Sequence, residues 1–334
     1  MTWVKPYVLV TGAGGFIGHH LVKYLKDQGC WVRGADIKNP EFEATAADDF
    51  RLTDLRDIEA CHAAVRGVDE VYHLAANMGG IGFITAVRAD VVRDNVTMDA
   101  NMLEAAGQQR VRRFFYASSA CVYPKSLQES PDVAPLREEQ AIPAEPEDGY
   151  GWEKLLAEQM CRYALEEHGL QTRVARFHNV YGPLGTYEGG REKAPAALCR
   201  KIALARDGDE IEVWGDGLQT RSFLSVDECV EGIWRITQSD HDRPLNLGTD
   251  RMVTVRQLAE MIIGISGKKL SLRFDPSKPQ GVRGRNSDNA RLRQVLGWEP
   301  RVPLEEGLAK TYRWVLEQSR KAEQRIWDAK EWIA

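Results

Sequence analysis

The feature of the sequence that most constrains its fold is a glycine-rich turn near the start. An apolar run, Val8–Thr11, leads into glycines at positions 12, 15 and 18, and a stretch typical of a helix follows. Glycines are needed where a chain turns tightly, where its backbone approaches a pyrophosphate, and where a helix packs closely on a strand. The start of the following helix offers free N–H groups and a favourable dipole for phosphate. The segment therefore predicts the first βα turn of a dinucleotide-binding domain.

An acidic residue after the second expected strand narrows the choice of dinucleotide. Asp36 ends the apolar run Trp31–Asp36. A carboxylate there accepts hydrogen bonds from both ribose hydroxyls and repels a 2′-phosphate, which favours NAD over NADP. Asp54 is expected where enzymes of this class contact adenine. The expected NAD-binding residues are Gly12, Gly15, Phe16, Ile17, Gly18, Asp36, Asp54, Tyr150 and Lys154.

Short β-rich runs alternate with helical stretches through the first half of the chain. The expected elements include strands at Tyr7–Thr11, Glu70–Ala75 and Arg113–Ser118 and helices at His19–Gln28, Asn95–Gln109 and Gly151–His168. This alternation predicts an α/β fold, a Rossmann-type doubly wound parallel sheet with a smaller, interleaved C-terminal substrate-binding domain. We expect the NAD-binding domain over residues 1–178, with returning segments near 222–250, and the substrate-binding domain mainly over residues 179–334.

Composition argues against several kinds of partner and site. The net charge of −5 argues against nucleic-acid binding, which needs clustered positive charge. No apolar run reaches the roughly 18 residues that suggest a membrane span, and the first residues lack the pattern of a signal peptide. The six cysteines are scattered without CxxC spacing, so no metal site and no disulfide framework is expected. These features predict a cytoplasmic protein that does not bind membranes.

A tyrosine and a lysine four residues apart are candidates for acid–base chemistry. Tyr150 and Lys154 fall on one face of the helix expected from Gly151. A lysine ammonium beside a phenol lowers the pKa of the phenol, so Tyr150 is expected to act as a general base. Together with Ser119, which follows an expected strand, the pair resembles the catalytic set of the short-chain dehydrogenase/reductase superfamily. The resemblance implies that Ser119 bonds the substrate oxygen and that Lys154 also holds the nicotinamide ribose.

The length of the chain and two further segments resemble the extended branch of that superfamily. These segments are Trp214–Arg221 and Asn179–Pro183. Members of this branch act on nucleotide-linked sugars and retain NAD tightly. The resemblance therefore implies a nucleotide sugar as the substrate.

Cys121 and Lys193 are two further groups that can move protons. Cys121 follows Ser119 by two residues, and Lys193 lies in a loop that opens a helix. Around them the sequence is similar to the GDP-mannose 3,5-epimerases, over a resemblance that runs from Val8 to about Tyr312. The runs that carry the resemblance are Met78–Phe83, Phe114–Cys121, Gly189–Ala197, Trp214–Phe223 and Gly281–Asn289.

The family resemblance implies a role for each matching position. Tyr150 and Lys154 handle oxidation at carbon 4, while Cys121 and Lys193 form the acid/base pair. The positions implied to bind GDP-mannose are Gly79, Ser119, Ala120, Cys121, Tyr150, Asn179, Glu192, Lys193, Ala194, Lys201, Gln219, Arg221 and Arg285. Of the arginines, we favour Arg285 for bidentate binding of the pyrophosphate, with Arg221 second.

The implied chemistry is epimerisation through a transient 4-keto sugar. Tyr150 takes the proton of the 4-hydroxyl, and the ketone then acidifies the hydrogens on carbons 3 and 5. A base on one face and an acid on the other invert first carbon 5 and then carbon 3. The expected product is GDP-L-galactose, with GDP-L-gulose from inversion at carbon 5 alone, and NAD is regenerated.

Other interpretations remain open from the residues. A UDP- or dTDP-sugar 4-epimerase or 4,6-dehydratase shares the scaffold, although a dehydratase is expected to carry an acid pair where Ala120 and Cys121 stand. A non-catalytic NAD-binding protein is a third possibility, but it would have no use for the base Tyr150. Asn77 departs from the family pattern, which has an aspartate there. We also expect a homodimer formed through the helices near 95–109 and 151–168.

Overall fold

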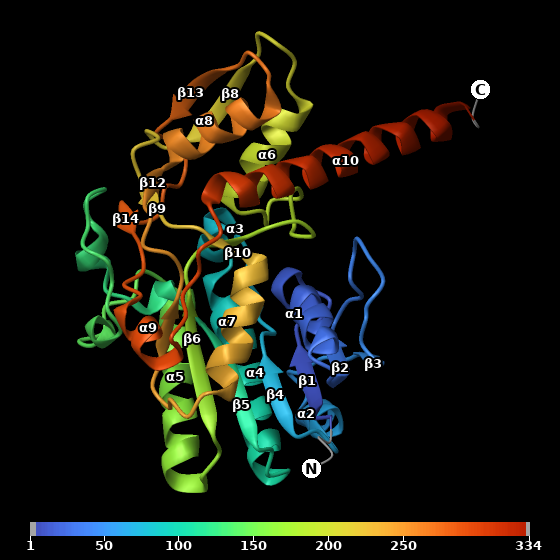
Figure 1. Cartoon of the computed structure of the whole chain (residues 1–334), viewed down its shortest axis with the longest axis vertical. Helices are drawn as coiled ribbons and strands as arrows, with labels where there is room; N and C mark the ends of the chain where they lie inside the picture. Colours follow the sequence, from blue (N-terminus) through green and yellow to red (C-terminus); the bar gives the residue numbers. More distant parts are fainter. Residues whose placement is uncertain (1–4, 332–334) are drawn as a thin grey trace.

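The computed structural model describes residues 5–331 and is built around one parallel sheet (Figure 1). Seven strands follow one another in the order β11-β6-β5-β4-β1-β2-β3, and each neighbouring pair is parallel. The strands are β1 (Tyr7–Thr11), β2 (Trp31–Asp36), β3 (Asp49–Leu52), β4 (Glu70–His73), β5 (Arg113–Ser119), β6 (Thr172–Phe177) and β11 (Leu245–Leu247). The chain moves outward from β1 to β3, crosses back to β4 and continues to β11. This doubly wound order confirms the predicted fold class.

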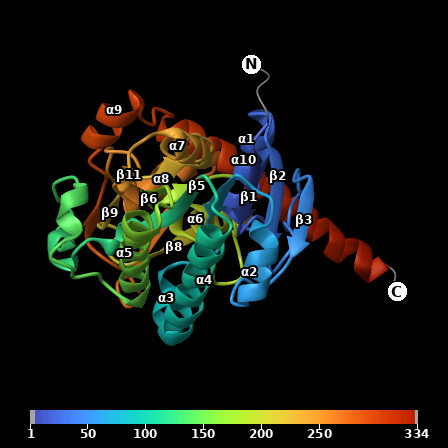
Figure 2. The same ribbon diagram turned by 90° about the horizontal axis from the view of Figure 1, so that it is seen from below.

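Helices cover both faces of the sheet, which is why its central strands are apolar on both sides. Figure 2 shows α1 (Phe16–Asp27) and α7 (Val226–Gln238) on one face, where side chains such as Leu21 and Ile233 are fully buried. The other face is covered by α2 (Ile58–Val65), α4 (Arg88–Gln108) and α5 (Gly149–His168). Each helix contributes one apolar stripe to one of two cores.

A second, smaller body lies beyond the carboxyl ends of the strands (Figure 1). Its core is formed largely by side chains of three helices and one strand, including Ile202, Leu258 and Val315. Its elements are α6 (Ala194–Leu204), α8 (Val255–Ser266), α10 (Leu304–Glu331), β8 (Glu210–Trp214), β13 (Ser271–Asp275), and the short strands β7 (Val180–Tyr181), β9 (Thr220–Arg221), β10 (Leu224–Ser225), β12 (Val253–Thr254) and β14 (Gly284–Arg285).

The second half of the chain returns to the sheet twice. First, α7 covers one face and β11 adds an edge strand. Later, α9 (Ala290–Leu296) packs against β11 and buries Leu292 in the same core. The division into domains at 178/179 remains a prediction, and its outer ends at residues 1–4 and 332–334 lie outside the described residues.

Several elements begin earlier than the sequence indicated. The helix expected from Asn95 begins at Arg88, because a short helix α3 (Ile81–Ala86) and a break at Val87 immediately precede it. Its first turns are mostly polar, so they carry no apolar stripe that would have marked them. Among residues 5–331, no helix combines the length and the apolar composition that a membrane span requires.

Candidate active site

The glycine-rich turn after β1 has the shape of a cradle for a pyrophosphate. Gly12 has a φ of +71°, and a Cβ there would lie 2.9 Å from the amide nitrogen of Ala75. A Cβ at Gly14 would overlap the carbonyl oxygen of Lys38, and one at Gly18 would overlap that of Gly12. Helix α1 starts at Phe16 with no side chain capping its first N–H groups. These residues fit NAD, because the glycines have no side chains and so leave the backbone N–H groups of the turn accessible to a pyrophosphate.

The two predicted acidic contacts to the cofactor differ in their surroundings. Asp36 ends β2, and one of its carboxylate oxygens accepts from the backbone N–H of Gly14 at 2.9 Å. Burial raises the pKa of this carboxyl, although these backbone hydrogen bonds oppose the rise. Asp54 instead pairs with Arg56 at 2.6 Å, which lowers the pKa of Asp54. Asp36 is therefore hydrogen-bonded to the phosphate turn, whereas Asp54 forms an ion pair with Arg56.

The loop that follows Asp36 lies beside this turn and reaches the second half of the chain. A pocket at the start of α1 is lined by Gly14 and Phe16 on one side and by Phe42 and Leu184 on the other. The ring of Phe42 meets that of Trp314 on α10 edge to face, with centroids 4.9 Å apart. It also meets Tyr187 at 5.9 Å. The loop therefore lines the pocket and contacts the second half of the chain.

Tyr150 and Ser119 are brought together by a glycine. Ser119 ends β5, and Tyr150 lies in the first turn of α5, which Asp148 caps. Gly151 packs so closely that a Cβ there would overlap the carbonyl oxygen of Cys121. This approach brings the Tyr150 hydroxyl to the Ser119 side chain, with which it forms a hydrogen bond.

The structure corrects the electrostatic role that the sequence suggested for Lys154. The ammonium of Lys154 donates to the hydroxyl of Tyr116 at 3.0 Å and lies 5.7 Å from the ring centroid of Tyr150. Burial raises the pKa of Tyr150 well above its ordinary value. The predicted lowering of that pKa is therefore wrong for this structure, because desolvation of the phenolate dominates.

A second buried group adjoins Lys154. Glu153 accepts from the Asn95 side chain at 2.7 Å, and its carboxylate lies 3.8 Å from the Lys154 ammonium. Burial raises the pKa of Glu153 to about 7. Asn95 also accepts from the backbone N–H of Asn77 at 2.6 Å, and the Asn77 side chain donates to Asp94 at 3.2 Å. The residue that departs from the family pattern thus belongs to the polar network beneath the site.

Cys121 and Lys193 come from distant parts of the chain and act on each other electrostatically. Cys121 lies in the short helix η1 (Ala120–Val122), and its backbone N–H donates to the Ser119 side chain at 3.2 Å. Lys193 is reached by solvent but is surrounded by protein atoms, which lower the pKa of its ammonium. The charge of Cys121 is the strongest of those that oppose this lowering. The loop before α6 is held in place by a hydrogen bond from the N–H of Gly80 to the carbonyl of Arg191, at 3.0 Å.

The other predicted substrate-binding residues come from several elements, and several already have protein partners. Asn179 donates to the carbonyl of Ser222 at 2.9 Å, and Lys201 donates to that of Glu212 at 2.8 Å. Gln219 donates to the carbonyl of Trp214 at 2.9 Å, while its buried side-chain oxygen has no hydrogen-bond partner among the described residues. A Cβ at Gly79 would touch the ring of Phe83. Glu192 accepts a hydrogen bond from the N–H of Gly190. Ala194 is the first residue of α6, and Ala120 is buried in η1.

Arg221 and Arg285 lie on neighbouring strands β9 and β14. Arg221 donates to the carbonyls of Thr220 and Val282, and burial lowers its pKa to about 9. Arg285 contacts Cys121 instead, with 3.4 Å between Nη1 and Sγ. Arg285 therefore lies at the thiol of the predicted acid/base pair.

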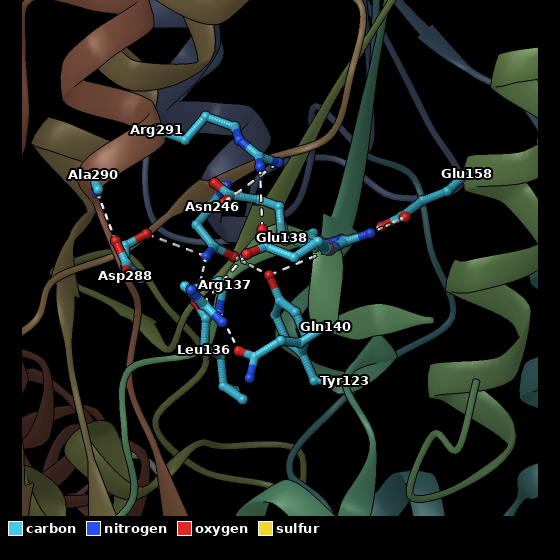
Figure 3. Close-up of polar contacts among 12 residues, drawn as sticks. Tyr123, Leu136, Arg137, Glu138, Gln140, Glu158, Asn246, Asp288, Ala290 and Arg291 are labelled. Atoms are coloured by element: carbon cyan, nitrogen blue, oxygen red, sulfur yellow. Dashed lines mark hydrogen bonds and ion pairs between the residues drawn. The ribbon is translucent and has the colours of Figure 1, made fainter. Parts of the chain in front are cut away.

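A buried polar cluster fixes the long loop that follows Cys121 (Figure 3). Asn246 on β11 accepts from the Tyr123 hydroxyl at 2.6 Å and donates to the carbonyl of Leu136 at 2.7 Å. Arg176 on β6 donates to Glu158 on α5 and to the carbonyl of Glu138, both at 2.7 Å. The loop is thereby tied to the edge of the sheet behind the site.

Comparison with known proteins agrees with this arrangement. A family model described as the NAD dependent epimerase/dehydratase family matches residues 8–248. The chain belongs to this family. It is therefore an NAD-dependent enzyme, and the cofactor predicted from the sequence is confirmed.

Two individual relatives indicate which kind of epimerase/dehydratase this chain resembles. It is 48% identical over 316 residues to a GDP-mannose 3,5-epimerase of Arabidopsis thaliana, covering 94% of this chain and 83% of that protein. It is also 48% identical to GDP-mannose 3,5-epimerase 1 of Oryza sativa subsp. japonica, covering 95% of this chain and 83% of that protein. The resemblance stated from the sequence is thereby confirmed.

A solved structure shows the same fold. The UDP-glucose 4-epimerase of Thermotoga maritima, solved with UDP-glucose, superposes with a TM-score of 0.85 at 27% identity. The match covers 93% of this chain and 99% of that one. A nucleotide sugar is thus the class of substrate for this epimerase/dehydratase chain.

Sequence reasoning missed several side chains that touch the site. Tyr116 holds Lys154, Gln128 and Glu147 flank Arg285, and Glu153 adjoins Lys154. Only Glu153 carried a signal, since it lies inside the Tyr150–Lys154 motif. The other three reach the site through contacts that no local pattern announces.

Proposed function

We infer that this enzyme converts GDP-D-mannose to GDP-L-galactose by inverting carbons 3 and 5, and releases GDP-L-gulose when only carbon 5 is inverted. The observation that carries this inference is that Cys121 hydrogen-bonds to Ser119 and interacts electrostatically with both Tyr150 and Lys193. A simple 4-epimerase has no use for the pair of Cys121 and Lys193. The similarity to GDP-mannose 3,5-epimerases over 94% of the chain supports the same substrate.

We propose that the glycine turn, Asp36 and Lys154 hold NAD. The turn would receive the pyrophosphate and Asp36 the adenosine ribose, with Phe16, Ile17 and Asp54 beside them. Lys154 would bind the nicotinamide ribose. When bound, NAD supplies a hydride acceptor for carbon 4 of the sugar and returns that hydride at the end of the cycle.

Within this proposal the chain moves protons at three positions of the sugar. Ser119 hydrogen-bonds the oxygen on carbon 4, and Tyr150 exchanges the proton of that hydroxyl. A ketone at carbon 4 acidifies the hydrogens on carbons 3 and 5, because the carbanion is delocalised as an enediolate. Cys121 and Lys193 remove and deliver these protons on opposite faces, which inverts the carbon. The lowered pKa of Lys193 suits this role, since its proton is easier to transfer near neutral pH.

The remaining predicted contacts would orient the nucleotide. Gln219 has an unpartnered buried oxygen, which suits it to accept from a polar group of the substrate. We assign the rest of the binding surface to Gly79, Ala120, Asn179, Glu192, Ala194, Lys201, Arg221 and Arg285.

The oligomeric state and the location are also proposals. Trp152, Leu156 and Tyr163 are large apolar side chains exposed on α5. Exposed apolar side chains on one helix favour a homodimer that buries them, with α4 alongside. All six cysteines are unpaired, which agrees with the reducing cytoplasm that we propose for the enzyme.

Deuterium exchange tests the proposed reaction directly. Purified enzyme is incubated with GDP-mannose in deuterated water, without added cofactor, and the sugar protons are followed by NMR. We expect deuterium at carbons 5 and 3 together with new galacto and gulo signals. Cys121→Ala should abolish the exchange and retain bound NAD, whereas Cys61→Ala, in helix α2, should retain both. Turnover of UDP- or dTDP-sugars with no exchange into GDP-mannose would contradict the assignment.

A further inference from the structure

The Arg285 guanidinium lies against the sulfur of Cys121. Nη1 is 3.4 Å from Sγ, within the range of a hydrogen bond to sulfur. Arg285 is only 7% exposed, so the guanidinium side of this contact is shielded from water, while the sulfur is partly exposed. A guanidinium beside a sulfur stabilises the negative charge of a thiolate, and it does so more strongly where water is excluded.

Gln128 fixes the guanidinium in this position. Its side-chain oxygen accepts from Nε of Arg285 at 2.5 Å, across 157 residues of sequence. Its side-chain nitrogen donates to the carbonyls of Tyr123 and Pro124, directly after the helix that carries Cys121. Gln128 is 1% exposed and therefore joins the arginine to the backbone beside the cysteine.

Glu147 faces the other side of the same guanidinium. One of its carboxylate oxygens lies 3.7 Å from Nη2 of Arg285, which is an ion pair without a hydrogen bond. Nη2 is buried and has no hydrogen-bond partner among the described residues. The guanidinium is thus bonded firmly to Gln128, contacts Cys121 on one side, and is drawn weakly toward Glu147 on the other.

The charged groups that face Cys121 come from several elements. Arg285 lies on β14 and Arg221 on β9, and the charge of Cys121 also acts on Lys193 at the start of α6. Tyr150 on α5 is neutral, and Glu147 is the carboxylate that acts on these arginines. The positive charges of Arg285, Arg221 and Lys193 outnumber the negative charge of Glu147. Together these groups favour a negative charge on the sulfur of Cys121.

We propose that Gln128 is a positioning residue that keeps the Arg285 guanidinium on the sulfur of Cys121, and that the guanidinium in this position holds Cys121 as a thiolate. For the reaction itself this rests on the proposed function. The thiolate takes the proton from the carbon beside the ketone and becomes a thiol, while the C–H electron pair is delocalised as the enediolate. The Lys193 ammonium gives its proton to the opposite face and becomes an amine.

Alkylation of Cys121 by iodoacetamide tests the proposal without any sugar. Cys121 is partly exposed and the other five cysteines are buried, so the rate can be followed on its peptide by mass spectrometry. The NAD-loaded enzyme is treated across a range of pH. We expect the half-maximal rate below a pH of about 7.5, at least one unit under the ordinary value for cysteine. A half-maximal rate at about 8.5 or above would overturn the proposal.

Variants separate the charge effect from a general loosening. Gln128→Met and Arg285→Met should move the half-maximal pH up by one unit or more, which slows alkylation at pH 7 about fivefold or more. Glu147→Gln should move it down, because the guanidinium loses its competing carboxylate. Gln108→Met, on the exposed end of α4, should not move it. A loosened site would change the maximal rate and leave the half-maximal pH in place, and that result for both methionine variants would also overturn the proposal.

Deuterium exchange distinguishes this inference from the proposed function. If the half-maximal pH of alkylation shifts as expected but no deuterium enters GDP-mannose, the substrate assignment is wrong and the thiolate proposal stands. If deuterium enters GDP-mannose but the alkylation curves of the variants do not shift, the proposed reaction stands and the proposed role of Arg285 is wrong.

Discussion

Lys154 donates a hydrogen bond to the hydroxyl of Tyr116, with 3.0 Å between Nζ and Oη. That hydroxyl in turn donates to Asp99 at 2.8 Å, and the other oxygen of Asp99 lies 2.9 Å from Nε2 of His73. All four side chains are buried. The orientation of Lys154 on α5 therefore depends on Tyr116 on β5 and on Asp99 on α4, and neither of these residues belongs to the motif that contains the lysine.

Removing the Tyr116 hydroxyl should destabilise the protein and loosen the cofactor. Tyr116→Phe leaves a buried oxygen of Asp99 without a donor, which costs roughly 1–3 kcal/mol. It also frees the Lys154 ammonium from its acceptor, so we expect faster loss of NAD. Urea unfolding and the NAD content after gel filtration measure the two effects. Tyr7→Phe, at an exposed position at the start of β1, is the control, and equal behaviour of the two variants would refute the argument.

Glu153 should make stability depend on pH. Burial raises its pKa to about 7, whereas an unfolded glutamate has a pKa of about 4.3. Between these values the folded chain binds the additional proton, so stability falls as the pH rises through the window. Relative to the wild type, Glu153→Gln should therefore gain roughly 1–3 kcal/mol of unfolding free energy between pH 5 and pH 8. Urea unfolding at both pH values tests this, with Glu167→Gln as a control that should show no such gain.

Gly151 should not tolerate even a methyl group. In Gly151→Ala the new Cβ would overlap the carbonyl oxygen of Cys121 and lie 2.8 Å from the Cβ of Pro146. The start of α5 must then move away from η1, at a loss of roughly 1–3 kcal/mol of stability. Because Tyr150 moves with it, we expect kcat to fall at least about tenfold. Gly264→Ala in α8, where nothing lies within 4 Å, should instead stabilise the protein by about 0.5–1 kcal/mol.

The loop that carries Phe42 should control how fast NAD exchanges. Phe42→Ala removes the ring contacts to Tyr187 and Trp314. We expect bound NAD to exchange with isotopically labelled NAD at least about fivefold faster, for a loss of about 1 kcal/mol from the closed loop. Trp314→Phe keeps an aromatic ring and should have a smaller effect. Identical exchange in the wild type and Phe42→Ala would show that the loop does not cover the cofactor.

The regions of the fold and site that could be predicted were those with a local signature. The turn at Gly12 and the spacing of Tyr150 and Lys154 each lie within a few residues, so their geometry follows from one strand–helix junction or one helix face. The short strand β3 and helix α2 had no such signature and were not expected.

The electrostatics of the site could not be predicted in the same way. Whether Lys154 meets Tyr150 or Tyr116 depends on how α5 packs on β5, and desolvation then reverses the expected change in the pKa of Tyr150. Gln128 reaches Arg285 from a long loop, which Asn246 ties to the sheet at Leu136. Such contacts arise from the tertiary fold alone.

The contact between Phe42 and Trp314 has a consequence for how the enzyme behaves in a cell. The rings belong to opposite halves of the molecule, and Phe42 also lines the pocket at the phosphate turn, so release of a dinucleotide past this loop would require the rings to separate. Each copy of the enzyme would then keep one dinucleotide through many reaction cycles. Its rate would follow the supply of sugar nucleotide and would be insulated from swings in the ratio of oxidised to reduced nicotinamide around it.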